Sequence, residues 1–297
     1  MSYFFSKQDE LLALCKAHDA PISEIMIRRE LELGNMTRDE IMAEMRLNID
    51  TMRESIRVGL TEDQRTISGL MGGDAELLEL YAAKSHMGER MARIVAASMA
   101  VLEVNASMGK IVAAPTAGAS GILPGVLIVC AEYNNWDDET IEKGLFCAGA
   151  IGMMIMENAS MSGAEGGCQA ETGSGAAMAA AALTELSGGS PAMALHAAAI
   201  SLKNVMGLVC DPVAGLVECP CIKRNAIGAA NAVMSADMAL AGIKSIIPFD
   251  EVVLTMKSVG RQIVPDLRET AKGGLAATPT ARRITRELGL GRDAFDD

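Results

Sequence analysis

The chain has 297 residues, enough to bury a large hydrophobic core as one large domain or two smaller ones. Half of the residues are hydrophobic but only 3% are aromatic, and the wealth of Ala, Leu and Met favours closely packed helices over strands. The formal net charge of −12 argues against nucleic acid as a general partner, because phosphate binding needs clustered Lys and Arg.

We expect no targeting segment at the N-terminus, because Lys7, Asp9 and Glu10 interrupt any apolar signal core. The most apolar windows, 146–156 and 176–183, are too short to cross a bilayer. Seven cysteines, an odd number, indicate a reducing compartment and metal or catalytic use ahead of disulfides. We therefore expect a cytoplasmic protein that does not enter a membrane.

Two helices are predicted near the N-terminus. The first spans residues 20–33 and stops at Gly34, and the second follows a capping box at Thr37–Glu40. The second helix is expected to end near residue 58, at Gly59. Each has one polar face, which is typical of helices that lie at a surface.

A Gly-rich break at 68–75 separates these helices from the remainder of the chain. Beyond it, the pattern predicts further helices at about 76–104, 126–133, 137–156, 176–188, 191–205 and 222–240, and a last segment at 249–264. No alternation of strands and helices is visible, which excludes a doubly wound sheet. The sequence thus predicts an all-α fold, a multi-helix bundle with long Gly-rich loops.

We expect a single helical domain over residues 1–297. Within it, residues 1–67 are predicted to form a peripheral helical region, 68–280 the core that carries the functional site, and 281–297 a tail.

Three long loops connect the apolar helices, at 105–125, 157–175 and 208–221, and all are rich in small or polar residues. Glycine lets backbone N–H groups approach a ligand closely, and loops held on a rigid scaffold commonly carry chemistry. These loops are the candidate site.

Cysteines fall into two groups by context. Three lie in apolar helical patterns and are expected to be small core residues: Cys15, Cys130 and Cys147. The others lie in the second and third loops, where burial alone does not explain them: Cys168, Cys210, Cys219 and Cys221. These loop cysteines are candidates for metal binding.

Several kinds of site remain open at this point. Zinc usually takes paired half-sites, and Cys219-Pro-Cys221 is tighter than a usual half-site. An iron–sulfur cluster tolerates dispersed ligands, and three cysteines would leave one iron open as a Lewis acid. A cysteine nucleophile needs a neighbouring base, for which only three histidines are available. Pyridoxal phosphate folds contain parallel sheets, which this sequence does not predict.

Four segments carry a family resemblance: GKIVAAPTAGASGILPGVL (109–127), SGAEGGCQAETGSGAAMAAAAL (162–183), LVCDPVAGLVECPCIKRNA (208–226) and LRETAKGGLAATPT (267–280). Together they resemble the iron–sulfur-dependent L-serine dehydratases, and more narrowly the α subunit of the two-chain form. The resemblance runs in order from about residue 20 to about residue 280.

The resemblance implies a [4Fe–4S] cluster on which the loops converge. Its ligands would be Cys168, Cys210 and Cys221, with the fourth iron facing the substrate. Cys219 stands where the family usually has an aliphatic residue, so it is expected to be a neighbour of the cluster only. The implied reaction is the conversion of L-serine to pyruvate and ammonia by loss of water.

A small zwitterionic substrate needs donors for its carboxylate. The candidates in the first loop are Thr116, Ala117, Gly118, Ser120 and Gly121, and those outside it are Asn105, Lys110, Arg224 and Asn225. Arg224 and Lys223 have an equally plain interpretation as the solvated start of a helix.

The resemblance further implies a partner. In the family, the general base is thought to lie in a serine- and histidine-containing motif of the β portion, and none of the motifs around His18, His86 and His196 matches it. We therefore expect a hetero-oligomer with a β subunit. Two other interpretations remain: a related cluster-dependent L-cysteine desulfidase, and a non-catalytic helical or zinc-binding subunit.

Overall fold

The computed structural model describes residues 2–34, 36–62 and 64–290. Over these ranges the chain forms thirteen α-helices and short 3-10 turns, and its one extended pairing is an isolated parallel bridge between Cys210 and Arg268. The predicted all-α class is confirmed.

The N-terminal helices are α1 (Gln8–His18), α2 (Ile22–Leu33) and α3 (Arg38–Thr61). The predicted capping box precedes α3, since Glu40 accepts a 2.7 Å hydrogen bond from the N–H of Thr37. The expected end at Gly59 is wrong, because α3 continues through it. A Cβ on Gly59 would lie 2.4 Å from the carbonyl oxygen of Ala100. This glycine therefore permits a close helix crossing.

The single long helix predicted over 76–104 is wrong. The chain instead forms α4 (Asp74–Tyr81), a 3-10 turn (Ala82–Lys84) and α5 (Glu89–Ala106). Gly88 precedes α5 with φ of 80°, a conformation that breaks helical continuity.

The central helices are α6 (Ile122–Asn134), α7 (Asp138–Asn158), α8 (Gly163–Gly166), α9 (Cys168–Leu186) and α10 (Pro191–Asn204). The loop expected at 157–175 is shorter than predicted, because α9 begins at Cys168 rather than after Gly175. Its glycines are tolerated because neighbours pack against them: a Cβ on Gly175 would lie 3.1 Å from Ile122. Tertiary packing outweighs helix propensity here.

The C-terminal helices are α11 (Cys221–Leu240), α12 (Phe249–Gln262) and α13 (Pro279–Glu287). The predicted helix at 222–240 is confirmed. The domain divisions at residues 67 and 280 stay predictions.

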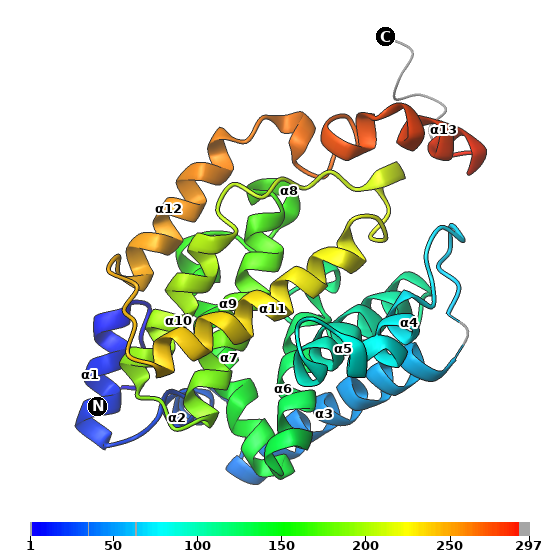
Figure 1. Cartoon of the computed structure of the whole chain (residues 1–297). Coiled ribbons are helices and arrows are strands. Elements are labelled where there is room, and N and C mark those ends of the chain that lie inside the picture. Colours follow the sequence, from blue (N-terminus) through cyan, green and yellow to red (C-terminus); the bar gives the residue numbers. More distant parts are fainter. Residues whose placement is uncertain (1, 35, 63, 291–297) are drawn as a thin grey trace.

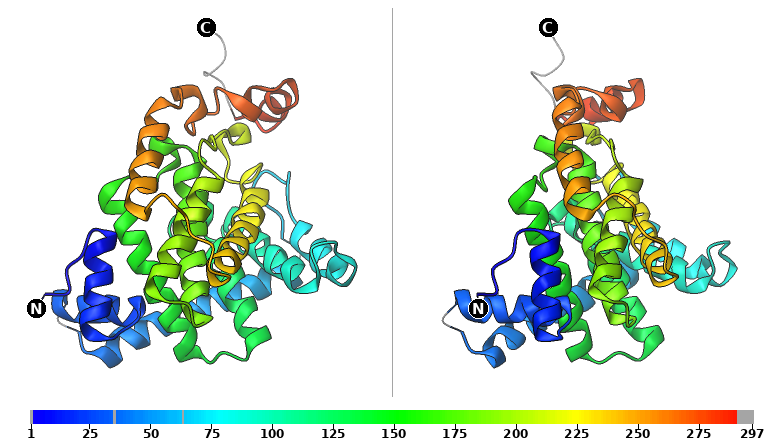
Figure 2. Two further views of the ribbon diagram at one scale, coloured as in Figure 1. Left: turned by 60° about the vertical axis from the view of Figure 1, so that its left-hand side comes forward. Right: turned by 90° about the vertical axis from the view of Figure 1, so that its left-hand side faces the viewer.

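Helix α9 lies at the centre of the molecule, in contact with α6, α7, α10 and α11 (Figure 1). Its run of alanines from 179 to 182 is fully buried. Small side chains allow the neighbouring helices to approach closely. In all views the segment after α12 lies across one end of the molecule, over the loop that precedes α11 (Figures 1 and 2).

The hydrophobic core also takes in the N-terminal helices, since α2 packs on α7 and α3 packs on α5. The three cysteines predicted to be core residues are buried, with exposed fractions of 5% for Cys15, 1% for Cys130 and 0% for Cys147. That prediction is confirmed. In the described ranges, every helix is too short or too polar to cross a membrane.

Candidate active site

Three cysteines from separate parts of the chain meet at one end of the bundle. Cys168 is the first residue of α9, Cys221 is the first residue of α11, and Cys210 lies in the loop after α10. Cys168 and Cys210 are 5% and 3% exposed. The three thiols are close enough that, in addition to burial, Cys168 and Cys221 raise the pKa of Cys210, and Cys168 raises the pKa of Cys221.

This shared environment changes the acidity of the thiols. Burial raises the pKa of Cys210, and the neighbouring Cys168 and two carboxylates raise it further. Burial and Cys168 raise the pKa of Cys221 to about 12. Burial also raises the pKa of Cys168, an effect that a hydrogen bond with Thr172 and the charge of Arg224 oppose. Thiolates here need compensating positive charge.

Part of that positive charge comes from the helices themselves. Cys168 and Cys221 occupy the first positions of α9 and α11, which have 19 and 20 residues. The N-terminus of a helix carries partial positive charge and stabilises a thiolate placed there.

Cys210 is held by the C-terminal segment. Its N–H donates to the carbonyl oxygen of Leu267 at 2.8 Å, and its own carbonyl oxygen accepts from the N–H of Glu269 at 2.7 Å. These two bonds flank Arg268, the partner of Cys210 in the parallel bridge. The sequence predicts a loop around Cys210 but contains no signal for the contacts that fix it.

Two carboxylates that the sequence analysis missed face the same space. A Cβ on Gly163 would lie 2.9 Å from Glu171 Oε2, 3.0 Å from Cys210 Sγ and 3.2 Å from Glu269 Oε2. Thr116 donates a 2.8 Å hydrogen bond to Glu171. Burial raises the pKa of the Glu171 carboxyl, and the charge of Glu269 adds to this. The absence of a side chain at Gly163 lets these three groups approach its backbone closely.

A sequence signal for Glu171 does exist. It follows Cys168 by three positions, which is one helical turn once α9 is known to begin at Cys168. Glu269 has no such signal, because only the bridge at Arg268 brings it to the cysteines.

The 115–121 loop passes beside Glu171. A Cβ on Gly118 would lie 3.2 Å from the Glu171 carboxylate. In the described part of the chain, the N–H groups of Ala117 and Gly118 have no hydrogen-bond acceptor. They are two free donors of this loop.

Ser120 and Gly121, also predicted as substrate contacts, bond within the protein. The fully buried Ser120 hydroxyl donates to the carbonyl oxygen of Ala117 at 2.8 Å. The N–H of Gly121 donates to Asn225 Oδ1 at 3.1 Å. Asn225 in turn donates to the carbonyl oxygens of Gly118 and Cys221, at 2.7 and 3.0 Å. Asn225 therefore ties the loop to the start of α11.

The predicted cations and Asn105 lie in different surroundings. Arg224 is buried and bonds to the residues on either side of Cys210. Lys223 is exposed and pairs with Asp74 at 2.8 Å. Asn105 is half-buried in the last turn of α5, and Lys110 is exposed. Of these four, Arg224 is the one that the structure brings to the cysteines.

Within residues 2–34, 36–62 and 64–290, no group of three or more His, Cys, Asp or Glu side chains is placed to hold a metal ion. All seven cysteines are free. A zinc clip built from Cys219 and Cys221 is therefore without further ligands in the described structure.

Residues 17–276 match the family described as serine dehydratase alpha chain. The chain is 48% identical to a probable L-serine dehydratase, alpha chain, of Bacillus subtilis, over 96% of this chain and 95% of that one. It is 46% identical to the L-serine dehydratase, alpha chain, of Peptoniphilus asaccharolyticus, over 94% and 96%. An L-serine dehydratase of Streptomyces coelicolor is 40% identical over 93% of this chain but 61% of its own length.

Proposed function

The chain belongs to the serine dehydratase alpha chain family, and we propose that it is the catalytic α subunit of an L-serine dehydratase. This lyase removes water from L-serine to give 2-aminoacrylate, which tautomerises and hydrolyses to pyruvate and ammonia. The observation that carries the proposal is the meeting of Cys168, Cys210 and Cys221 beside Glu171 and the 115–121 loop.

We propose that the three cysteines hold a [4Fe–4S] cluster. The donor set fits this group, because thiolates are its usual ligands and two of these stand at helix N-termini. In a cluster each thiolate binds a different iron, so the three sulfurs need not converge on one point as they must for a single zinc ion.

When bound, the cluster supplies a Lewis-acidic iron for the hydroxyl group of the substrate. Residues of this chain would bind the carboxylate and ammonium groups at the other end of the substrate. The N–H groups of Ala117 and Gly118 are free to receive the carboxylate. Thr116 holds Glu171 beside Gly118, and we propose that Glu171 receives the ammonium group. An ammonium group there offsets the burial of the Glu171 carboxylate.

We propose further that a β subunit completes the site and supplies the general base. Two relatives are named alpha chains, and the longer Streptomyces coelicolor relative extends well beyond the matched region. The seven free cysteines support a location in the reducing cytoplasm.

The decisive experiment combines the anaerobically reconstituted chain with a β chain and measures turnover of L-serine and L-cysteine. We expect pyruvate from L-serine at the higher kcat/KM. A preference for L-cysteine would identify a desulfidase instead. Bound zinc in place of iron and sulfide, with no turnover, would identify a non-catalytic subunit.

A further inference from the structure

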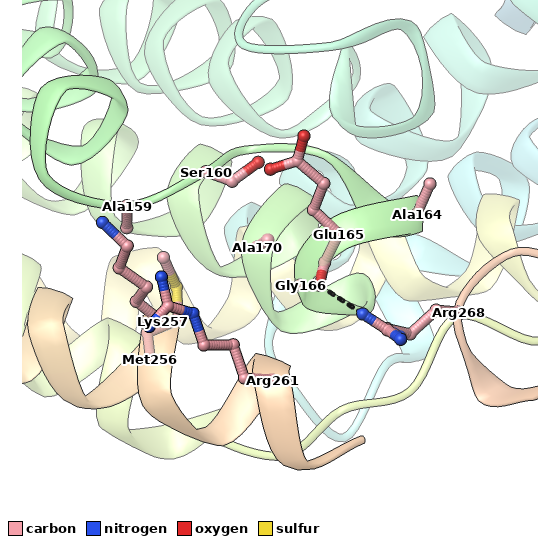
Figure 3. Close-up of a pocket in the computed structure, with 10 residues that line it drawn as sticks. All are labelled: Ala159, Ser160, Ala164, Glu165, Gly166, Ala170, Met256, Lys257, Arg261 and Arg268. Atoms are coloured by element: carbon pink, nitrogen blue, oxygen red, sulfur yellow. Dashed lines mark hydrogen bonds between the residues drawn. The ribbon is translucent and has the colours of Figure 1, made fainter. Parts of the chain in front are cut away.

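A cavity of about 300 Å³ lies beside α8. Its walls come from the loop after α7, from α8, from the first turn of α9, from α12 and from Arg268 (Figure 3). Three cations line it, Lys257, Arg261 and Arg268, together with one acidic residue, Glu165. Neither the predicted substrate residues nor the three cysteines are among its lining residues.

Positive charge in this cavity is not neutralised by the protein. In the described ranges, Lys257, Arg261 and Arg268 form no salt bridge. Lys257 donates to the carbonyl oxygen of Asn158 at 3.0 Å. The carboxylate of Glu165 points toward Ser160, away from the arginines (Figure 3). The cavity is thus lined by three cations and by one carboxylate, which is exposed to solvent.

One hydrogen-bond donor of Arg268 is buried without an acceptor. Its Nη1 makes only a long contact, 3.4 Å, with the carbonyl oxygen of Glu165, and its Nε is buried without an acceptor. A buried donor without a partner is costly, and an ordered ion or ligand is a common reason for one.

We propose that this cavity binds a small oxyanion with two or more negative charges, either a phosphate group or a dicarboxylate. Arginine and lysine favour such groups through charge-assisted hydrogen bonds. The volume is at the lower end of that of small-molecule sites. The apolar residues Ala159, Ala164, Ala170 and Met256 leave room for a short carbon chain.

Occupancy of the cavity acts on the backbone that holds Cys210. The anion engages Arg268, which lies between the two residues that bond to Cys210, Leu267 and Glu269. It also contacts Gly166, two residues before Cys168. A bound anion therefore rigidifies both segments, and this inference does not depend on the proposed reaction.

The test uses the full chain without substrate, with inorganic phosphate and succinate as probes and sodium chloride at matched ionic strength. Calorimetric titration and thermal unfolding should both detect binding of one of the two probes. Binding of phosphate alone identifies a phosphoryl ligand, and binding of succinate alone identifies a dicarboxylate. If neither probe binds above the chloride control, the proposal is wrong.

Variants then locate the site. Arg261→Gln and Lys257→Gln should each weaken binding about tenfold or more, as expected for loss of one charge-assisted hydrogen bond. Arg261→Lys, which keeps the charge, should restore part of the affinity. Arg283→Gln is the control, because Arg283 is exposed and pairs with Glu287 on α13. Equal losses in Arg261→Gln and Arg283→Gln would overturn the assignment.

Hydrogen exchange tests the connection to Cys210. The bound anion should slow exchange of the Cys210 and Glu269 amides, which donate the two bridging hydrogen bonds. The N–H of Thr140, which donates to Asp137 at the start of α7, serves as a reference that should not change. Binding without slower exchange at Cys210 and Glu269 would refute this connection.

Discussion

Arg224 and Asp211 form a buried ion pair, with Nη2 and Oδ1 2.7 Å apart. Arg224 is 9% exposed and Asp211 is 3% exposed. Arg224 also donates to the carbonyl oxygen of Val209 at 2.8 Å. The guanidinium therefore holds both neighbours of Cys210 against the first turn of α11, where Cys221 lies.

Replacing one member of this pair should be strongly destabilising. Asp211→Asn leaves Arg224 buried without its countercharge, and we expect a loss of about 3–5 kcal/mol in the free energy of unfolding. Denaturation by urea measures this loss. Asp74→Asn, which breaks the exposed pair with the adjacent Lys223, is the matched control and should cost less than about 1 kcal/mol. Similar losses in both variants would contradict the structural role of Arg224.

The proposed ligand set predicts different outcomes for neighbouring cysteines. Cys168→Ser, Cys210→Ser and Cys221→Ser should each abolish the cluster, because serine is a poor ligand for iron in such clusters. Cys219→Ser should retain it. Iron and sulfide analysis after anaerobic reconstitution provides the measurement. Loss of the cluster in Cys219→Ser would show that the ligand set is wrong.

Glu171 is proposed to receive the ammonium group of the substrate. Glu171→Gln should therefore raise KM for L-serine about tenfold or more, while iron content stays unchanged. Thr116→Val, which removes the hydroxyl that orients Glu171, should have a smaller effect in the same direction. An unchanged KM in Glu171→Gln, or loss of iron, would assign this residue another role.

Gly59 and Gly149 provide a paired test of helix packing. A Cβ on Gly59 in α3 would meet the Ala100 carbonyl at 2.4 Å, whereas a Cβ on Gly149 in α7 would meet no atom within 4 Å. Gly59→Ala should lower the free energy of unfolding by about 1–3 kcal/mol through overpacking. Gly149→Ala should raise it by roughly 0.5–1 kcal/mol through helix propensity. Thermal or urea unfolding distinguishes the two signs, and stabilisation by both would refute the close crossing.

The buried carboxyl of Glu103 should make the free energy of unfolding depend on pH. It is fully buried and accepts hydrogen bonds from the N–H groups of Gly73 and Ala75, at 3.0 and 3.1 Å, at the start of α4. Burial raises the pKa of its carboxyl. The folded state thus holds the proton more tightly than the unfolded state does. Its contribution to stability is full below the unfolded pKa and is lost as pH rises through the folded pKa.

Urea denaturation from mildly acidic to neutral pH should therefore show a decline in stability with rising pH that is shallower in Glu103→Gln. Glu54→Gln is the control, because Glu54 lies on the exposed surface. Identical pH dependences in wild type and Glu103→Gln would contradict the raised pKa.

Much of the fold could be read from local signals. The structure confirms the helix start after the capping box at Thr37 and the starts expected near residues 137 and 191. The predicted break of the second helix at Gly59 failed because the sequence does not reveal which glycines are needed for close contact. The prediction of a single helix over 76–104 failed for a related reason, since the hydrophobic pattern continues across the turn before Gly88.

The sequence by itself determined the helical class and the loops that carry the cysteines, because periodicity and loop composition are local properties. Tertiary structure decided which residues share the site. Glu171 enters it because α9 begins at Cys168, and Glu269 enters it through the bridge between Cys210 and Arg268. In the tertiary structure, Ser120 and Asn225 form hydrogen bonds within the protein. Contacts between distant segments depend on how helices pack, and no local pattern encodes them.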